Sequence, residues 1–388
     1  DAVVADVWMK GVNGIAATTA IRRVCADTRV ILMTRTVDSR VEQAARLAQD
    51  LETKSDGVQI RVVDPPELPR VPSSPNRLLL LTGVLVVALI LAIIVMNPAF
   101  AEPTGYMNYL KRVAALAILS GGALYVIVSG GFDLSVGSLM TLTVIGSSML
   151  ASNDPNSTYW IIPLMLGIGA VVGLINGLVV SNLKVPSLIA TLGMMISLNG
   201  VAFMWSGGAP RGYLPDTFRF FGRYNIPDVP LIGILPVAVI CLAAFGLVLW
   251  WGMHRTNYGR MLHAVGDNPQ AARLAGVPVK SVRISAFVIS SLTAVLAGVI
   301  LGGRAGVSVD IGSGFELQAI TAAVIGGAQL LGGRGSVPAT IAGALALEAI
   351  FTLLNLLGLA QPIRLVVQGL ILIGAVAFAT YQRKRVGR

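Results

Sequence analysis

The feature that most constrains this chain is a series of long apolar segments that begins near residue 78. A helix needs about 20 apolar residues to cross a membrane, and it satisfies its own backbone hydrogen bonds there. Charged residues make up only 12% of the chain, about half their usual share in soluble domains. We therefore predict an all-α polytopic membrane protein with ten transmembrane helices, over 78–96, 113–131, 134–152, 159–181, 186–206, 231–251, 284–303, 315–331, 336–357 and 365–381.

Two of these spans are expected to be broken or re-entrant. The turn at Gly130-Gly131-Phe132-Asp133 is very tight, and the segment 315–331 is short and contains Glu316. Irregular backbone at membrane depth is tolerated only where protein shelters it or where it lines a watery cavity. Both places are therefore candidates for helix breaks inside the membrane.

The distribution of basic residues predicts the orientation. With the amino terminus inside, twelve lysines and arginines fall on the cytoplasmic side and six on the outer side. Cytoplasmic loops of membrane proteins carry such an excess. The reverse orientation would place the basic loop 252–283 and the basic tail outside. We therefore expect a multi-pass membrane protein with both termini in the cytoplasm.

The only long polar stretch within the apolar region runs from Trp251 to Val282. Its middle is expected to be a short helix, because Asn268 can cap it and Pro269 suits its first position. Gly276 can end this helix in a left-handed conformation, and Pro278 prevents its continuation. On charge alone the stretch is an ordinary basic cytoplasmic loop, whereas its ordered pattern favours a helix that docks on a cytoplasmic partner.

That pattern, AVGDNPQAARLAGV over residues 264–277, closely resembles the coupling loop of the membrane subunits of bacterial ABC importers for monosaccharides of the ribose, xylose, galactose and autoinducer-2 type. The resemblance covers roughly residues 76 to 388. It also includes SGGFDLSVGS at 129–138, GLING at 173–177, PSLIATLG at 186–193 and GGAQLLGGRGS at 326–336. Several long motifs in the right order make it specific.

The resemblance implies a permease domain over 77–388 with a fold like that of the vitamin-B12 importer. It implies a second permease copy, either identical or different, a periplasmic or extracellular sugar-binding protein, and a separate cytoplasmic ATPase that holds ATP and Mg²⁺. The coupling loop, 252–283, would fit a groove on that ATPase. The residues expected to couple to it are Gly266, Asn268, Pro269, Ala271, Ala272, Arg273 and Gly276.

The spans also suggest two inverted repeats. The groups 113–206 and 284–381 each hold four spans, a glycine-rich break and a polar turn that ends in proline. One group starts outside and the other inside, as repeats of opposite topology do in many transporters.

Several polar residues inside the spans are candidates for the translocation path. They are Asp133, Ser135, Asn176, Asn199 and Glu316. A charge within a span costs about 2.5–3.5 kcal/mol on insertion scales, so each needs a reason. Asp133 can line the path at a helix break, or can simply cap a helix. Pairing with arginines such as Arg304 is favoured for Glu316 and Glu348, and helix–helix contact is favoured for the asparagines.

The sequence offers no chemistry of its own. It has no phosphate-binding loop of the G-x-x-x-x-G-K-[ST] type and no credible catalytic or metal-binding pattern. We therefore expect a transport subunit for a pentose or hexose, without an ATPase site, a cofactor or a nucleic-acid partner. A branched-chain amino-acid permease is the alternative within the same class. Two alternatives from other classes fit less well. An ion-coupled secondary transporter should have more buried paired charges than this chain has. A signalling receptor should have an intact acidic pocket, which residues 1–50 lack.

Residues 1–50 resemble a fragment of a bacterial response-regulator receiver domain. Strands are expected over 2–5 and 29–34, with a helix over 14–23 between them, and Asp6 stands where that family has its phosphoacceptor. Lys10 replaces an expected proline, and the strand with the acidic metal-binding pair is missing. A carboxylate cannot accept a phosphoryl group without such partners. We expect a truncated fragment, followed by a charged and proline-rich linker over 51–76.

Overall fold

The chain divides into two compact units, Asp1–Arg70 and Val71–Arg388. The computed structural model describes residues 2–6, 29–33, 75–151, 154–230, 232–360, 362–363, 366–371 and 373–374. In the first unit, β1 (Ala2–Asp6) and β2 (Arg29–Met33) pair in parallel. Both predicted strands are confirmed, whereas the predicted helix over 14–23 and residues 51–74 of the linker lie outside the described residues.

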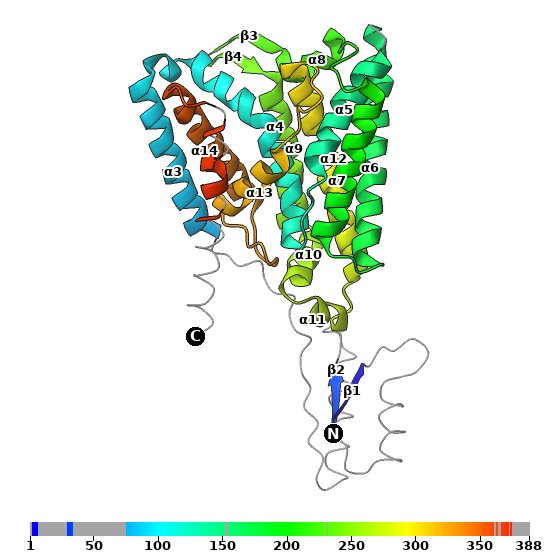
Figure 1. Cartoon of the computed structure of the whole chain (residues 1–388). Helices are drawn as coiled ribbons and strands as arrows, with labels where there is room; N and C mark the ends of the chain where they lie inside the picture. The colour runs from blue at the N-terminus through cyan, green and yellow to red at the C-terminus, as the bar shows by residue number, and fades with distance from the viewer. Residues whose placement is uncertain are drawn as a thin grey trace. The chain divides into compact units, whose positions relative to one another are not determined.

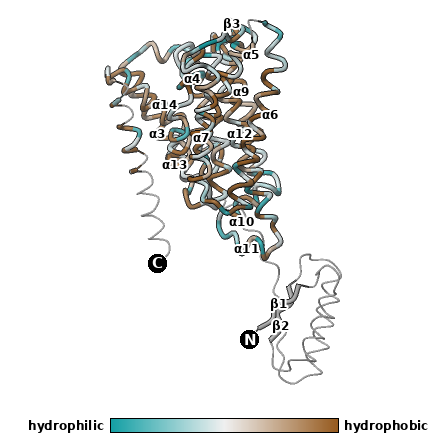
Figure 2. The backbone as a smooth tube through the Cα atoms, turned by 45° about the vertical axis from the view of Figure 1, so that its right-hand side comes forward, coloured by the Kyte–Doolittle hydropathy of each residue, from teal (hydrophilic) through white to brown (hydrophobic). Residues whose placement is uncertain are grey.

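The second unit is a bundle of helices (Figure 1). Seven described helices are long and apolar enough to cross a membrane. They are α3 (Pro75–Met96), α4 (Pro103–Val128), α6 (Thr158–Ser181), α7 (Ser187–Ser206), α9 (Val237–His254), α12 (Val279–Ala305) and α14 (Val337–Leu356). Apolar residues run along these helices and polar residues gather at the two ends of the bundle (Figure 2). The prediction of an integral membrane protein is therefore confirmed.

Two further apolar helices are short. They are α5 (Val136–Ala151) and α13 (Phe315–Ile325). The break expected before α5 is confirmed, since residues between Val128 and Val136 form no regular helix. The break expected within 315–331 is also found, because α13 ends at Ile325, before the turn at Gly326 and Gly327. Most of the tenth predicted span lies outside the described residues.

Smaller elements close the two ends of the bundle (Figure 1). One end carries α8 (Asp216–Arg223), the hairpin of β3 (Asn225–Val229) and β4 (Gly233–Pro236), and the short 3-10 turns Pro98–Ala101 and Pro155–Ser157. The opposite end carries α10 (Asn257–Asp267) and α11 (Pro269–Leu274), which lie within the predicted coupling loop.

The centre of the bundle is built on close contact between α12 and its neighbours α4 and α6. Three glycines at four-residue spacing on α6 face α12. A Cβ on Gly173 or Gly177 would lie 2.7 Å from the α12 backbone, and one on Gly169 would lie 2.6 Å from the Val295 side chain. Such small-residue stripes let two membrane helices approach backbone to backbone. The α6–α12 contact therefore allows no larger side chain.

Candidate functional site

The helix α11 has the ends that its sequence predicts. The Oδ1 atom of Asn268 accepts hydrogen bonds from the backbone N–H groups of Gln270 (3.0 Å) and Ala271 (3.1 Å), and Pro269 occupies the first turn. At the other end Gly276 is left-handed, with φ of 78°. Its N–H donates to the Arg273 carbonyl at 2.9 Å. These paired caps hold a helix of six residues that would be marginal alone.

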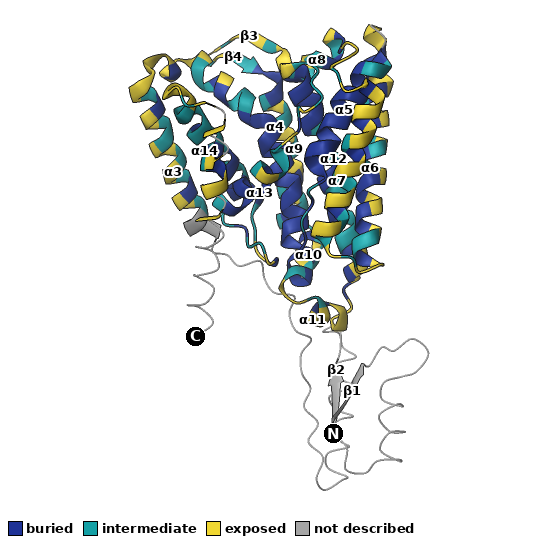
Figure 3. Cartoon of the chain, in the orientation of Figure 1, coloured by how far each residue is buried: buried dark blue, intermediate teal, exposed yellow. Residues whose placement is uncertain are grey.

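The two faces of α11 differ sharply. Ala272 is 5% exposed and belongs to an apolar cluster of the chain itself, together with Val277 and Val282. The expectation that Ala272 presents a surface to a partner is therefore wrong, because its methyl group supports the helix from beneath. The outer face carries Ala271, Arg273 and, with 88% of its surface exposed, Leu274 (Figure 3).

Leu274 was missed by sequence reasoning. A leucine in a short amphipathic helix normally turns inward, and only the packing of Ala272 shows that it turns outward here. A single exposed leucine is ordinary in itself, but Leu274 lies on the outer face of the helix that is predicted to dock, where a partner can reach it. We therefore add Leu274 to the residues that this helix offers to a partner.

The helix α10 anchors the predicted coupling loop (residues 252–283), which we call the coupling region, through His263. This side chain is 3% exposed, and its Nδ1 atom donates to the Gly333 carbonyl at 2.7 Å. The carbonyl can only accept, so Nδ1 carries the hydrogen. Burial lowers the pKa of His263, while the Gly333 carbonyl and the charge of Asp267 act in the opposite direction. The buried imidazole is therefore neutral at neutral pH.

Three segments meet beside His263 at backbone distance. The Gly333 N–H donates to the Val128 carbonyl, at the end of α4, at 2.9 Å. Gly266 lies against both, since a Cβ there would stand 1.8 Å from the Val128 oxygen and 2.3 Å from the Gly333 nitrogen. We call this contact of Val128, Gly266 and Gly333 the glycine junction. It joins the coupling region to α4 and to the loop before α14 without intervening side chains.

The break that follows α4, which we call the first break (residues 129–135), is sheltered by α7. The Phe132 N–H donates to Ser187 Oγ at 3.0 Å, and the Leu134 N–H donates to Thr191 Oγ1 at 3.1 Å. Unpaired backbone donors in an apolar environment are costly, so these two hydroxyls on one face of α7 allow the irregular backbone.

Asp133 lies in this break and is 4% exposed. Its Oδ1 atom accepts from the Ser135 N–H (3.1 Å) and from Ser135 Oγ (2.6 Å), and its Oδ2 atom accepts from Ser290 Oγ on α12 (2.9 Å). Asn176 on α6 donates through Nδ2 to Ser135 Oγ at 3.0 Å. Three of the five candidate path residues are thus joined in one network, together with Ser290. Ser290 was missed because a serine in an apolar span gives no sequence signal.

The other two candidate path residues lie elsewhere. Glu316 is in the first turn of α13, where its Oε1 atom accepts from the Gly314 N–H at 3.2 Å. Its Oε2 atom approaches the start of α5, since a Cβ on Gly137 would stand 2.2 Å from it. Asn199 lies on α7, two helical turns beyond Thr191. Neither joins the Asp133 network through a hydrogen bond among the described residues.

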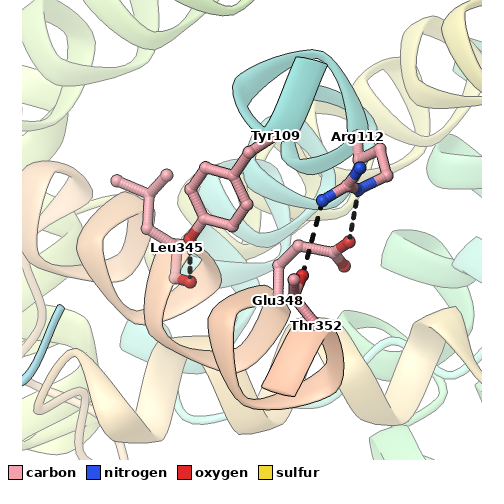
Figure 4. Close-up of polar contacts among 5 residues, drawn as sticks. All are labelled: Tyr109, Arg112, Leu345, Glu348 and Thr352. Carbon is pink, nitrogen blue, oxygen red and sulfur yellow. Dashed lines mark hydrogen bonds and ion pairs between the residues drawn. The ribbon is translucent and has the colours of Figure 1, made fainter. Parts of the chain in front are cut away.

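The predicted pairing of Glu348 with an arginine is confirmed at Arg112. Arg112 on α4 approaches it, with 3.4 Å between Nε and Oε1 (Figure 4). Arg112 Nη2 also donates to Thr352 at 3.5 Å, and the Tyr109 hydroxyl donates to the Leu345 carbonyl. Arg112 is available because α14 packs against α4, and Arg304 also lies near enough for the charge of Glu348 to act on it. The structural role predicted for Glu348 is retained.

Comparison with known proteins identifies the chain as similar to permease components of transport systems. Residues 105–376 match the family described as the branched-chain amino acid transport system / permease component. The ribose import permease protein of Bacillus subtilis is 35% identical over 295 residues, 74% of this chain and 88% of the relative. The autoinducer 2 import system permease of Klebsiella pneumoniae is 34% identical, covering 78% of this chain and 86% of the relative.

The L-arabinose transport system permease of Escherichia coli is 35% identical, and the match covers 78% of this chain and 91% of that protein. No solved structure matches the chain. The matched segments include the first break, the glycine junction and α11.

Proposed function

The chain belongs to the family of transport-system permease components, and on that premise we propose that it is the membrane subunit of an ABC importer that moves a monosaccharide across a bacterial cytoplasmic membrane. A separate cytoplasmic subunit would hold ATP and Mg²⁺ and hydrolyse the nucleotide. A periplasmic or extracellular protein would deliver the sugar.

The choice of substrate class rests on the relatives. Those with high coverage of this chain are named for ribose, autoinducer 2 and L-arabinose, whereas the family description alone names branched-chain amino acids. A pentose or hexose needs hydrogen-bonding groups without strong charge. The interior of the bundle offers buried serines, threonines and an asparagine, which suit such a ligand.

The proposed assembly has ten spans per subunit, a fold like that of the vitamin-B12 importer, and two permease copies around one path. Both termini lie in the cytoplasm. Internal inverted repeats are supported by the pairing of a long helix, a break and a short helix in two places, first α4 with α5 and then α12 with α13. Asp133, Ser135, Asn176 and Glu316 lie around the starts of the two short helices and are our candidates for the path, with Asn199 further along α7.

The coupling mechanism would be mechanical. The outer face of α11, with Leu274 and Arg273, would dock on the ATPase, where the planar guanidinium suits a carboxylate. The buried residues Ala272 on α11 and His263 on α10 would carry the movement of the docked ATPase to the glycine junction. From there it would reach the end of α4 and the first break. A nucleotide-dependent movement of the ATPase could thus bias two states of the path.

The first unit would contribute little to transport. We propose that residues 1–50 are a truncated receiver-like fragment and that 51–76 are a linker, with the permease domain over 77–388. Deletion of residues 1–72 should leave uptake within a factor of about two, because half a domain cannot close its own core. Loss of uptake with normal membrane insertion would contradict this.

Reconstitution tests the whole proposal. The chain, an ATPase subunit and a sugar-binding protein from the same gene neighbourhood would be placed in vesicles, and uptake of ribose, L-arabinose and leucine would be measured. We expect ATP-dependent uptake of a sugar that ionophores do not abolish. Preferential uptake of leucine would favour the amino-acid alternative, and uptake driven by an ion gradient without ATP would favour a secondary transporter.

A further inference from the structure

A cationic cavity of about 380 Å³ opens beside the first break, at the same end of the bundle as the coupling helices. Four basic residues line it: Lys184, Arg273, Lys280 and Arg283. None of the described residues that line it is acidic. Four like charges around one small space repel one another, and an anion that entered this space would relieve that repulsion.

The cavity also contains an unsatisfied polar group. The Ser181 side chain, at the end of α6, lines it and is 9% exposed. Its Oγ atom is buried and has no hydrogen-bond partner among the described residues. A buried hydroxyl without a partner is costly. It can donate to an oxygen of a ligand that enters the cavity.

The charges come from three separate elements. Lys184 lies in the turn between α6 and α7, Arg273 on α11, and Lys280 and Arg283 on the first turns of α12. Guanidinium groups bind phosphate oxygens in pairs, and ammonium groups bind them as point charges. The combination of these donors with a hydroxyl therefore fits the tetrahedral oxygens of a phosphate group.

The surroundings indicate where such a phosphate comes from. Exposed apolar residues stand next in the chain to the lining residues Lys184 and Ser187, with Leu183 at 71%, Leu188 at 49% and Ile189 at 64% exposure. A free phosphate would gain nothing from them, whereas acyl chains would cover them. Basic pockets between spanning helices on the cytoplasmic side are suited to anionic headgroups.

We propose that this cavity binds the phosphate group of an anionic phospholipid, with its acyl chains against Leu183, Leu188 and Ile189. The site touches the first break through Ser129, Gly130 and Gly131, and touches the coupling region through Arg273. A bound lipid would therefore hold these two segments together. The assignment to the cytoplasmic leaflet rests on the proposed function, whereas the phosphate chemistry does not.

Lipid retention by the purified full-length chain tests the proposal. The protein in detergent would receive equimolar phosphatidylglycerol and phosphatidylcholine, and bound lipid would be counted by native mass spectrometry. We expect preferential retention of phosphatidylglycerol. The double variant Lys184→Gln with Arg283→Gln should bind it roughly tenfold more weakly. Ser181→Ala, which keeps every charge, should cause a smaller loss of roughly threefold.

The matched control is Arg260→Gln. It removes an exposed charge from the same end of the bundle without touching the cavity, and it should retain the lipid as the wild type does. Equal retention by the double variant and the wild type would overturn the proposal. So would displacement of the lipid by millimolar inorganic phosphate, which would assign the cavity to a soluble anion.

Unchanged lipid retention with lost ATPase binding in the double variant would also overturn it, because the cavity would then receive an acidic side chain of the partner. None of these measurements requires transport. Failure of sugar uptake in a subunit that retains lipid normally would count against the proposed function and not against this site.

Discussion

Two breaks in the bundle have the same construction but different surroundings. The first break follows α4, and a second break, residues 306–314, follows α12. Each begins near a left-handed glycine, Gly130 with φ of 85° and Gly306 with φ of 87°. Each contains one aspartate and leads into a short apolar helix. Their ends meet, since a Cβ on Gly312 would lie 2.0 Å from the Gly137 carbonyl oxygen.

The two aspartates differ in what holds them. Asp133 is buried and accepts hydrogen bonds from Ser135 and from Ser290 on a distant helix. Asp310 is exposed and accepts from Ser308 within its own loop. A buried carboxylate is tolerated only when several donors satisfy it. The comparison teaches that the aspartate of the first break ties separate elements together, whereas the aspartate of the second break is satisfied within its own loop.

The largest contrast should come from removing the aspartates. Asp133→Ala leaves the hydroxyls of Ser135 and Ser290 without their acceptor, at about 1–3 kcal/mol for each unsatisfied buried group. Uptake should fall roughly 100-fold, whereas Asp310→Ala should stay within a factor of about two. Uptake by vesicles with matched subunit amounts measures both. Similar losses of uptake in the two variants would show that the two breaks do not differ in their importance for transport.

The next contrast concerns the connection of the first break to the coupling region. Gly266→Ala would drive a Cβ into the Val128 carbonyl and open the glycine junction. We expect uptake to fall roughly 30-fold, for about 2 kcal/mol of lost coupling. Gly193→Ala on α7 is the control, because a Cβ there meets nothing within 4 Å. Normal uptake by Gly266→Ala would show that coupling bypasses the junction.

A smaller effect is expected at the docking face. Leu274→Asp removes an apolar contact with the ATPase, but the new carboxylate stays exposed on the surface of the chain. The subunit should therefore insert normally and bind the ATPase roughly tenfold more weakly. Ala272→Asp forces a charge into the apolar cluster and should instead lower the yield of folded subunit. Co-purification of the ATPase with each variant separates the two effects. Undiminished binding by Leu274→Asp would remove α11 as the docking element.

The smallest effect should be one of pH. Burial lowers the folded-state pKa of His263, while the unfolded chain has the ordinary value near 6.5. The unfolded state therefore takes up the proton first, so this stability is present above about pH 6.5 and is lost as the pH falls toward the folded-state pKa. The Tm should fall by a few degrees on acidification.

His263→Gln, whose amide can still donate to the Gly333 carbonyl, should show a weaker dependence. Unfolding of both proteins, followed by tryptophan fluorescence across this pH range, measures the difference. An equal slope in the two proteins would place the titrating group at another residue than His263.

Local features of the fold were predictable from sequence, and distant contacts were not. The caps of α11 followed from Asn268, Pro269 and Gly276, because capping depends on neighbouring residues. The break at Asp133 was visible because a charge interrupts an apolar run. The partner of Glu348 and the role of Ser290 depend on which helices pack together, over sequence separations of 236 and 157 residues.

The inward face of Ala272 was also unpredictable, because six residues carry too little periodicity to show which side of a helix is buried. The helical content, the membrane location and the short capped helix α11 were therefore within reach of sequence reasoning, whereas the polar network around the first break required the fold.

The glycine stripe of α6 against α12 has a practical consequence for experiments on motion. Two backbones in direct contact have no side chains between them that could rearrange, so the distance between these helices should stay constant through a transport cycle. The distance between spin labels on the outer faces of α6 and α12 would serve as a constant reference. Labels that pair α6 with α7 or with α11 would then report movement against that reference.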